Sequence, residues 1–172
     1  LENQRLKNIV DDYLVKSDTI IAKVLSDKGS PFLRSIIINR GSKHNINLGM
    51  IAMDGEFLVG NVVEVNFFSS IILLLSDLNS KIPVIIEPNE VFSILSGTGK
   101  DYGIIQYSKK YEDIRNESII YTSGSGSLFK AGIPIGRMNN NFNDKEKKVE
   151  FFSDFSQLKF VKILSFIKNE AE

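Results

Sequence analysis

Two neighbouring stretches decide the fold: FLVGNVVEV at residues 57–65 and IILLL at residues 71–75. Both are short, apolar and rich in β-branched side chains, which favour extended strands. The longest uninterrupted apolar run, 71–75, is far below the ~20 residues that a membrane-spanning helix needs. The sequence therefore predicts β-strands at both places.

Runs of the same kind continue in both directions, and turn-forming residues such as Asp54-Gly55 and Pro88-Asn89 separate them. The further predicted strands are Thr19–Leu25, Ser35–Asn39, Ile82–Ile86, Val91–Leu95, Tyr102–Tyr107, Ser118–Thr122, Ile133–Met138, Val149–Phe152 and Leu158–Ile167. Many short strands without intervening helices indicate an antiparallel all-β sandwich or barrel.

The number of strands predicts two linked units, because about eleven strands exceed the ~8 of a closed small barrel. The predicted units are residues 17–98 and 99–167, followed by a tail at 168–172. The boundary is placed where Ser96-Gly97-Thr98-Gly99 interrupts the pattern. An exchange of one strand between the two units is left open by the sequence.

Residues 1–16 form the one predicted helix. Leu6, Val10 and Tyr13 recur at spacings of four and three, and charged residues take the other faces. A segment this short is marginal as an isolated helix. We expect it to be the end of a coiled-coil stalk that self-associates through these three side chains; a terminal helix packed on its own domain remains the alternative.

The amino-acid composition excludes several classes of function. The 172 residues contain 21 Lys and Arg and 21 Asp and Glu, so the net charge is zero, which argues against general nucleic-acid binding. The absence of cysteine excludes disulfides and thiolate chemistry, and the single His44 excludes a His-rich metal site. Because the chain begins at Leu1 rather than Met, we expect it to be part of a longer protein.

The candidate catalytic groups are weak. Neither Ser123 nor Ser125 has glycines two positions before and after it, as a nucleophile elbow requires, and no helix follows; His44 would have to be their base. The carboxylate pairs Glu87/Glu90 and Glu112/Asp113 lie in polar loops, where we expect all four to ionise normally. The sequence therefore predicts no enzyme, no cofactor and no metal site.

The sequence also gives little support for phosphate binding or for binding of single-stranded nucleic acid. Gly97-Thr98-Gly99-Lys100 resembles the end of a phosphate-binding loop but lacks the upstream glycine and the following helix. Aromatic pairs such as Phe67-Phe68 and Phe151-Phe152 lack flanking basic residues. These aromatic side chains are better interpreted as core or as a protein-binding edge.

Glycines recur at matching places in two hairpins. Gly49 precedes a strand pair that contains Gly60, and Gly132 precedes a strand that contains Gly136. A glycine inside a strand is typical of a bulge or a tight barrel corner. The likeness favours a short internal duplication.

Several motifs, in order, resemble the rod shape-determining protein MreC family. The most specific is TSGSGSLFKAGIPIG at residues 122–136, which is similar to the family's Thr-Ser-Gly loop and Gly-apolar-Pro-apolar-Gly strand. The others are LENQRL at 1–6, IIINRGS at 36–42, GM at 49–50 with LVGNV at 58–62, and LLLSDLNSKIPV at 73–84. Lys130 and Asn116-Glu117-Ser118 depart from the pattern, both in turns.

The resemblance implies a non-enzymatic periplasmic scaffold of the bacterial elongation complex, which organises and activates peptidoglycan synthesis. It implies two small six-stranded β-barrel-like domains after a coiled-coil helix, and an inner-membrane anchor outside this chain. The implied partners are a second copy as homodimer or filament, a class B penicillin-binding transpeptidase and MreD. We also expect the structural glycines to be Gly41, Gly49, Gly60, Gly124, Gly132 and Gly136.

Two function classes stay open beside the scaffold. One is a trypsin-like-fold hydrolase, which a contact between a serine and His44 would favour. The other is an oligosaccharide- or nucleic-acid-binding β-barrel, which a basic groove lined with aromatic rings would favour.

Overall fold

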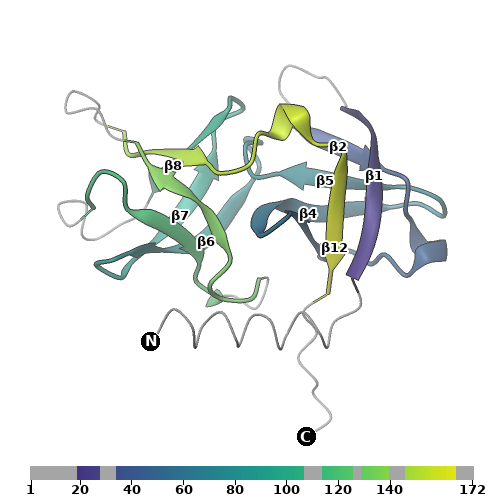
Figure 1. Ribbon diagram of the computed structural model, residues 1–172, viewed down its shortest axis with the longest axis horizontal. Coiled ribbons are helices and arrows are strands. Elements are labelled where there is room, and N and C mark those ends of the chain that lie inside the picture. The colour runs from purple at the N-terminus through teal and green to yellow at the C-terminus, as the bar shows by residue number, and fades with distance from the viewer. Residues whose placement is uncertain (1–18, 28–33, 107–113, 126–128, 140–145, 166–172) are drawn as a thin grey trace, which may run out of the picture.

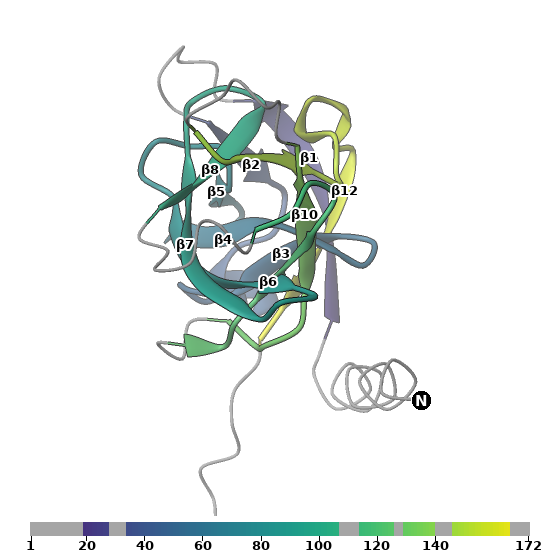
Figure 2. The same cartoon turned by 90° about the vertical axis from the view of Figure 1, so that its left-hand side faces the viewer.

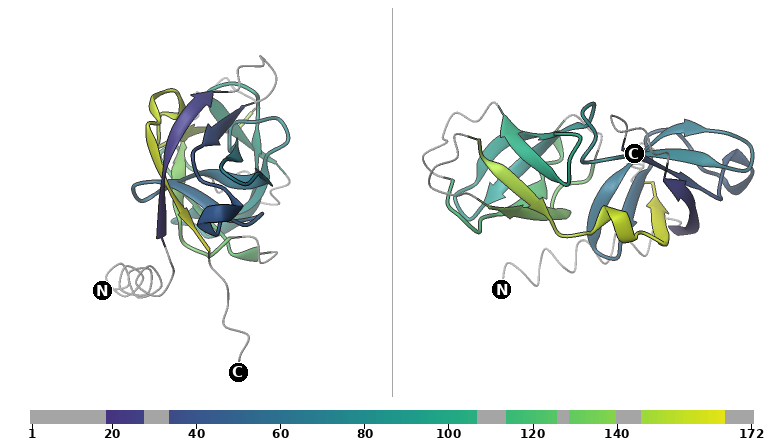
Figure 3. Two further views of the ribbon diagram at one scale, coloured as in Figure 1. Left: turned by 90° about the vertical axis from the view of Figure 1, so that its right-hand side faces the viewer. Right: turned by 90° about the horizontal axis from the view of Figure 1, so that it is seen from above.

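The computed structural model describes residues 19–27, 34–106, 114–125, 129–139 and 146–165. These residues form twelve strands in two closed, six-stranded antiparallel barrels that lie side by side along the long axis (Figures 1 and 3). The prediction of an all-β chain with two six-stranded barrels is confirmed. The helix predicted at 1–16, with Leu6, Val10 and Tyr13, lies outside the described residues.

The first barrel has the strand order β1-β12-β3-β4-β5-β2. Its strands are β1 (Thr19–Asp27), β2 (Ser35–Ile38), β3 (Ile51–Asp54), β4 (Phe57–Val65), β5 (Ser70–Leu74) and β12 (Phe160–Leu164). The inward-facing side chains of these strands fill the interior with Ile, Val, Leu and Ala. The last strand of the chain therefore closes the barrel that the first strand opens.

The second barrel has the strand order β10-β11-β8-β7-β6-β9, and Figure 2 shows it from its own end of the molecule. Its strands are β6 (Lys81–Glu87), β7 (Val91–Gly97), β8 (Tyr102–Gln106), β9 (Ile119–Thr122), β10 (Pro134–Met138) and β11 (Lys148–Phe151). All six are consecutive in the chain. The second barrel is thus an insertion between β5 and β12 of the first.

The predicted division at residue 98 was wrong. Strands β6 and β7, assigned to the first unit, belong to the second barrel, and β12, assigned to the second unit, belongs to the first. The interruption at Ser96-Gly97-Thr98-Gly99 is only the turn between β7 and β8. Strand spacing could not show this, because a turn inside a barrel and a linker between barrels use the same residues.

The two barrels share one local feature, a β-bulge that is followed by a glycine. Val59 in β4 and Ile135 in β10 are each an extra residue in the strand pairing, so both strands carry a β-bulge. A glycine follows each bulge and lies against a neighbouring strand: a Cβ on Gly60 would lie 2.1 Å from the Leu73 carbonyl oxygen, and one on Gly136 would lie 2.2 Å from that of Glu150. Close backbone approach, rather than an unusual dihedral angle, is what requires glycine here.

The other four predicted glycines lie in loops. Gly41 packs against the β4–β5 turn, where a Cβ would lie 2.2 Å from the Asn66 carbonyl oxygen. Gly49, Gly124 and Gly132 have φ angles of 85°, 77° and 89°, in the left-handed region that favours glycine. Gly49 precedes β3, and Gly124 and Gly132 belong to the loop between β9 and β10.

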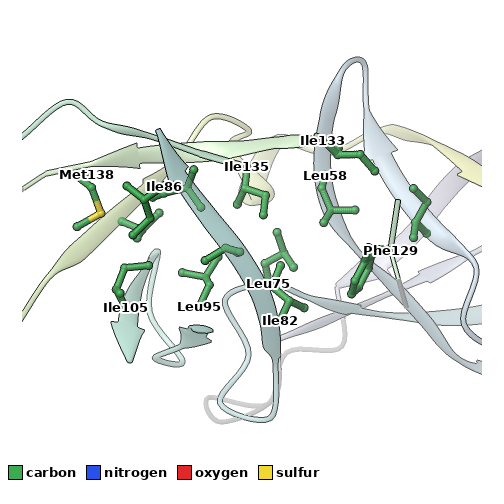
Figure 4. Packing of buried hydrophobic residues seen from close by; sticks show 14 of the residues in the cluster. Leu58, Leu75, Ile82, Ile86, Leu95, Ile105, Phe129, Ile133, Ile135 and Met138 are labelled. Atoms are coloured by element: carbon green, nitrogen blue, oxygen red, sulfur yellow. The ribbon is translucent and has the colours of Figure 1, made fainter. Parts of the chain in front are cut away.

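The cores of the two barrels meet. The larger hydrophobic cluster joins the interior of the second barrel, including Ile86 and Ile135, to Leu58 and Leu75 from the first-barrel side (Figure 4). The Phe57 and Phe152 rings lie with centroids 5.0 Å apart, and the Ser153 hydroxyl donates to the Asp54 carboxylate at 2.6 Å. These contacts fix one barrel against the other.

Asp77 forms a second set of contacts where the two barrels meet. Its side chain is fully buried, and its two carboxylate oxygens accept the backbone N–H groups of Arg34 at 2.6 Å and Asn79 at 2.8 Å. The Arg34 side chain in turn donates from Nε to the carbonyl of Gly99, in the β7–β8 turn of the second barrel, at 2.8 Å. One buried acid thus connects the entry to β2 with the linker between the barrels.

Candidate functional site

The candidate catalytic residues do not form a catalytic arrangement. His44 lies in the 3₁₀ turn Ser42–His44 of the first barrel, and its Nδ1 accepts the backbone N–H of Gly41 at 3.1 Å. Ser123 follows β9 in the second barrel, and its hydroxyl oxygen accepts the backbone N–H of Ser125 at 3.3 Å. Both side chains therefore stabilise local turns.

The Thr122–Gly132 loop has a structural role in the same way. The Thr122 hydroxyl accepts the N–H of Ile133 at 3.0 Å and donates to the carbonyl of Lys130. The Thr122 backbone also pairs with Gly132 and Ile133, which closes the loop between β9 and β10. In the most specific sequence motif, Thr122 thus stabilises the connection between two neighbouring strands.

The resemblance of residues 97–100 to a phosphate-binding loop disappears in the structure. The Thr98 hydroxyl donates to the carbonyl of Tyr102 at 2.7 Å and accepts the N–H of Lys100 at 3.2 Å, so it braces the β7–β8 turn. The segment leads into β8 rather than into a helix. No helix N-terminus is available here to face a phosphate.

Among the described ranges, no three His, Cys, Asp or Glu side chains gather where they could hold a metal ion. No helix in that part of the chain is long and apolar enough to cross a membrane. Of the two predicted carboxylate pairs, Glu112/Asp113 lies outside the described residues.

The expectation of ordinary ionisation was wrong for Glu87. Partial burial raises the pKa of the Glu87 carboxyl, and the charge of Glu90 raises it further. Ile86 pairs with Val91, so Glu87 and Glu90 lie at the two ends of the turn between β6 and β7. No base, nucleophile or metal accompanies them in the described residues, so the pair is a local electrostatic feature.

Replacing Glu87 with glutamine is expected to raise the melting temperature slightly at pH 7 and to leave it unchanged near pH 3.5. The folded protein binds the Glu87 proton more tightly than the unfolded chain does. That contribution to stability is complete below the unfolded pKa of about 4.3 and is lost as pH rises through the folded pKa. Thermal unfolding of E87Q at the two pH values, beside the exposed E56Q, measures this; equal shifts at both pH values would contradict it.

The strongest candidate for a functional surface is a row of apolar side chains across the second barrel. Ile85 of β6 lies opposite Phe92 of β7 and opposite Tyr121 of β9, and Tyr121 also pairs with Pro134 of β10. We call these four residues the Phe92 row. Their strand neighbours, such as Val84, are buried in the core, so the row faces outward.

The Phe92 row has the properties of a protein-binding surface. The Phe92 ring is 62% exposed, and the other three residues are partly exposed. The adjacent pair Pro83 and Ile94 extends the apolar character along the same face. Four neighbouring strands present no charged side chain in this row, and aromatic residues without neighbouring charges are typical of the centre of a protein interface.

Sequence reasoning missed this row. The signal was present, because Ile82, Val84 and Ile86 alternate with Pro83 and Ile85, so that both faces of one strand are apolar. A strand that is apolar on both faces is usually covered on both sides. The pair Phe67 and Phe68, interpreted as core or a protein-binding edge, is exposed at 58% and 62% on the β4–β5 turn of the first barrel.

The described residues form a double β-barrel whose second barrel carries an outward row of apolar side chains, and this combination defines the class of fold. Comparison with known proteins gives the family. The model of the rod shape-determining protein MreC barrel core matches residues 24–165, and the chain belongs to this family of cell shape-determining proteins. The resemblance inferred from the sequence motifs is confirmed.

Two curated relatives illustrate the match. The cell shape-determining protein MreC of Cereibacter sphaeroides is 32% identical over 141 residues, 82% of this chain and 47% of the relative. That of Caulobacter vibrioides is 30% identical over 169 residues, 96% of this chain and 48% of the relative. The chain therefore spans about half the length of these relatives.

Solved structures show the same fold. MreC from Pseudomonas aeruginosa matches with a TM-score of 0.80 at 24% identity, covering 86% of this chain and 99% of that one. A chain of the complex between penicillin-binding protein PBP2 and MreC from Helicobacter pylori matches with a TM-score of 0.64 at 14% identity, covering 87% and 99%.

Proposed function

We propose that this chain is the double-barrel part of a periplasmic, non-enzymatic scaffold that organises and activates peptidoglycan synthesis in the elongation complex. Membership of the MreC family and the complex recorded for the Helicobacter pylori relative support this role. The observation that carries it is the Phe92 row, an outward apolar surface with no partner in the described chain. A rigid barrel wall can hold such a row in one fixed geometry for a partner.

The proposed partner at the Phe92 row is a class B penicillin-binding transpeptidase. Aromatic side chains at the centre of an apolar patch are the residues that contribute most to protein–protein affinity. Other proposed contacts, to MreD and to further copies of the chain, belong to other segments. We propose self-association through Leu6, Val10 and Tyr13, and membrane anchoring through a segment outside the chain.

The variant F92S/Y121S is expected to weaken binding to the purified transpeptidase at least tenfold, because each buried aromatic ring at an interface centre is worth about 2 kcal/mol. Surface plasmon resonance measures this. The matched control is F160S, since Phe160 is 57% exposed on the outer wall of the first barrel.

Both variants should unfold within about 2 °C of the original protein, because the rings removed are largely solvent-exposed or lie on the outer wall. Unchanged binding by F92S/Y121S, or an equal loss of binding in F160S, would contradict the proposal that the transpeptidase binds at the Phe92 row. A loss only in F160S would place the partner on the first barrel.

A further inference from the structure

A second feature of the second barrel is a depression of about 400 Å³ on its outer wall, within the size range of small-ligand pockets. It lies around one cross-strand row, in which Lys81 of β6 pairs with Ser96 of β7, and Ser96 with Ile104 of β8. Ser96 has a small side chain between two larger ones, so the wall is hollowed at this point. We call this depression the lysine pocket.

Cationic side chains surround the lysine pocket. Lys81 and Lys100 line it, and neither forms an ion pair with any residue that the structure describes. Lys148 lies beside them, opposite Ile104, with its Nζ 5.0 Å from the centre of the Tyr102 ring. In a chain of zero net charge, the two lining lysines make a local positive site.

Acidic side chains offset this charge only in part. Glu146 lines the lysine pocket, and Asp101 is exposed in the adjoining turn. Glu150 lies opposite Tyr102, but its carboxylate is 3.4 Å from Nε of Arg137. The lining itself therefore carries two lysines against one glutamate.

The floor and rim add two other kinds of contact. The Ser96 hydroxyl donates to Oε1 of Gln106 at 2.9 Å, which orients the Gln106 amide and leaves its Nε2 to donate to a ligand. Leu78, 51% exposed, and the partly buried Tyr102 form an apolar rim. An inorganic anion would use only the lysines, whereas a sugar ring carrying a carboxylate would use all three kinds of group.

We propose that the lysine pocket binds an acidic saccharide: the ammonium groups of Lys81 and Lys100 hold the carboxylate, Gln106 binds a sugar hydroxyl or amide, and Leu78 and Tyr102 contact the ring. This site is separate from the Phe92 row, and it does not depend on the transpeptidase contact. Muramic acid and uronic acids share this chemistry, so the test includes both.

The test is a titration of the ¹⁵N-labelled chain, followed by amide chemical shifts. The probes are N-acetylglucosaminyl-N-acetylmuramic acid, its uncharged methyl ester, a glucuronic-acid disaccharide and inorganic phosphate. We expect saturable shifts at residues 94–106 with at least one acidic disaccharide, and an affinity at least about fivefold lower for its uncharged counterpart. The disaccharide that binds more tightly identifies the source of the ligand.

The variant K81Q/K100Q should weaken binding of the acidic disaccharide at least about fivefold. The matched double variant K159Q/K162Q on the first barrel should leave this binding unchanged. L78S should weaken binding of the acidic disaccharide as well, because the substitution removes the apolar side chain from the rim and leaves the lysines in place. Three results would overturn the proposal: no saturable shift with either acid, equal binding of the methyl ester, or equal binding of phosphate at the same residues.

Discussion

Replacing Gly60 or Gly136 with alanine is expected to lower the free energy of unfolding by about 3 kcal/mol, and the melting temperature by roughly 6–12 °C. A methyl group at either position would lie within 2.2 Å of a carbonyl oxygen on the neighbouring strand. That atom belongs to a hydrogen-bonded barrel wall, so it cannot move without disturbing the pairing of two strands. Urea denaturation followed by circular dichroism measures the loss.

Gly55→Ala is the matched control, because it separates crowding from dihedral strain. Gly55 has a φ of 59° in the β3–β4 turn, and a Cβ there would meet no atom within 4 Å. Its replacement should cost only about 1 kcal/mol, the price of a left-handed dihedral angle. If the three variants lost equal stability, close approach would not be what demands glycine beside the bulges.

Asp77→Ala is expected to destabilise the protein by about 2–4 kcal/mol. The variant removes the fully buried acceptor of the Arg34 and Asn79 backbone N–H groups; a donor left unsatisfied in a buried site costs about 1–3 kcal/mol, and the exposed Asn79 loses less than the half-buried Arg34. Asp77→Asn should lie between the original protein and the alanine variant, because one oxygen still accepts. Chemical denaturation of the three proteins provides the comparison.

Asp101→Ala is the control for Asp77, since it removes an exposed acid from the nearby β7–β8 turn. Its effect should stay within about 0.5 kcal/mol. An equally small effect at Asp77 would mean that the buried carboxylate does not hold the junction.

The class of fold was predictable from the sequence because its physical basis is local. Short apolar runs rich in β-branched residues, as in Lys81–Glu87, and turn residues between them determine which segments become strands. The glycine positions also carried information: Gly60 and Gly136 both lie directly after a bulge. The structure adds the physical reason, which is close approach to a neighbouring strand, since neither glycine has a positive φ.

Barrel membership was not predictable in the same way. Nothing local in Phe160–Leu164 shows that it pairs with Thr19–Lys23 at the other end of the chain. The Phe92 row depends on the same long-range pairing, because its four members come from strands that adjoin only in the closed barrel. The lysine pocket likewise needs the register of β6, β7 and β8.

The insertion of one barrel into the other has a consequence for synthesis on the ribosome. The second barrel is complete once Phe151 has emerged, since its six strands are consecutive. The first barrel starts earlier but must wait for β12, and until then the edges of β1 and β3 have no partner. The part of the chain made first is therefore finished last, and its open edges are exposed to aggregation during translation.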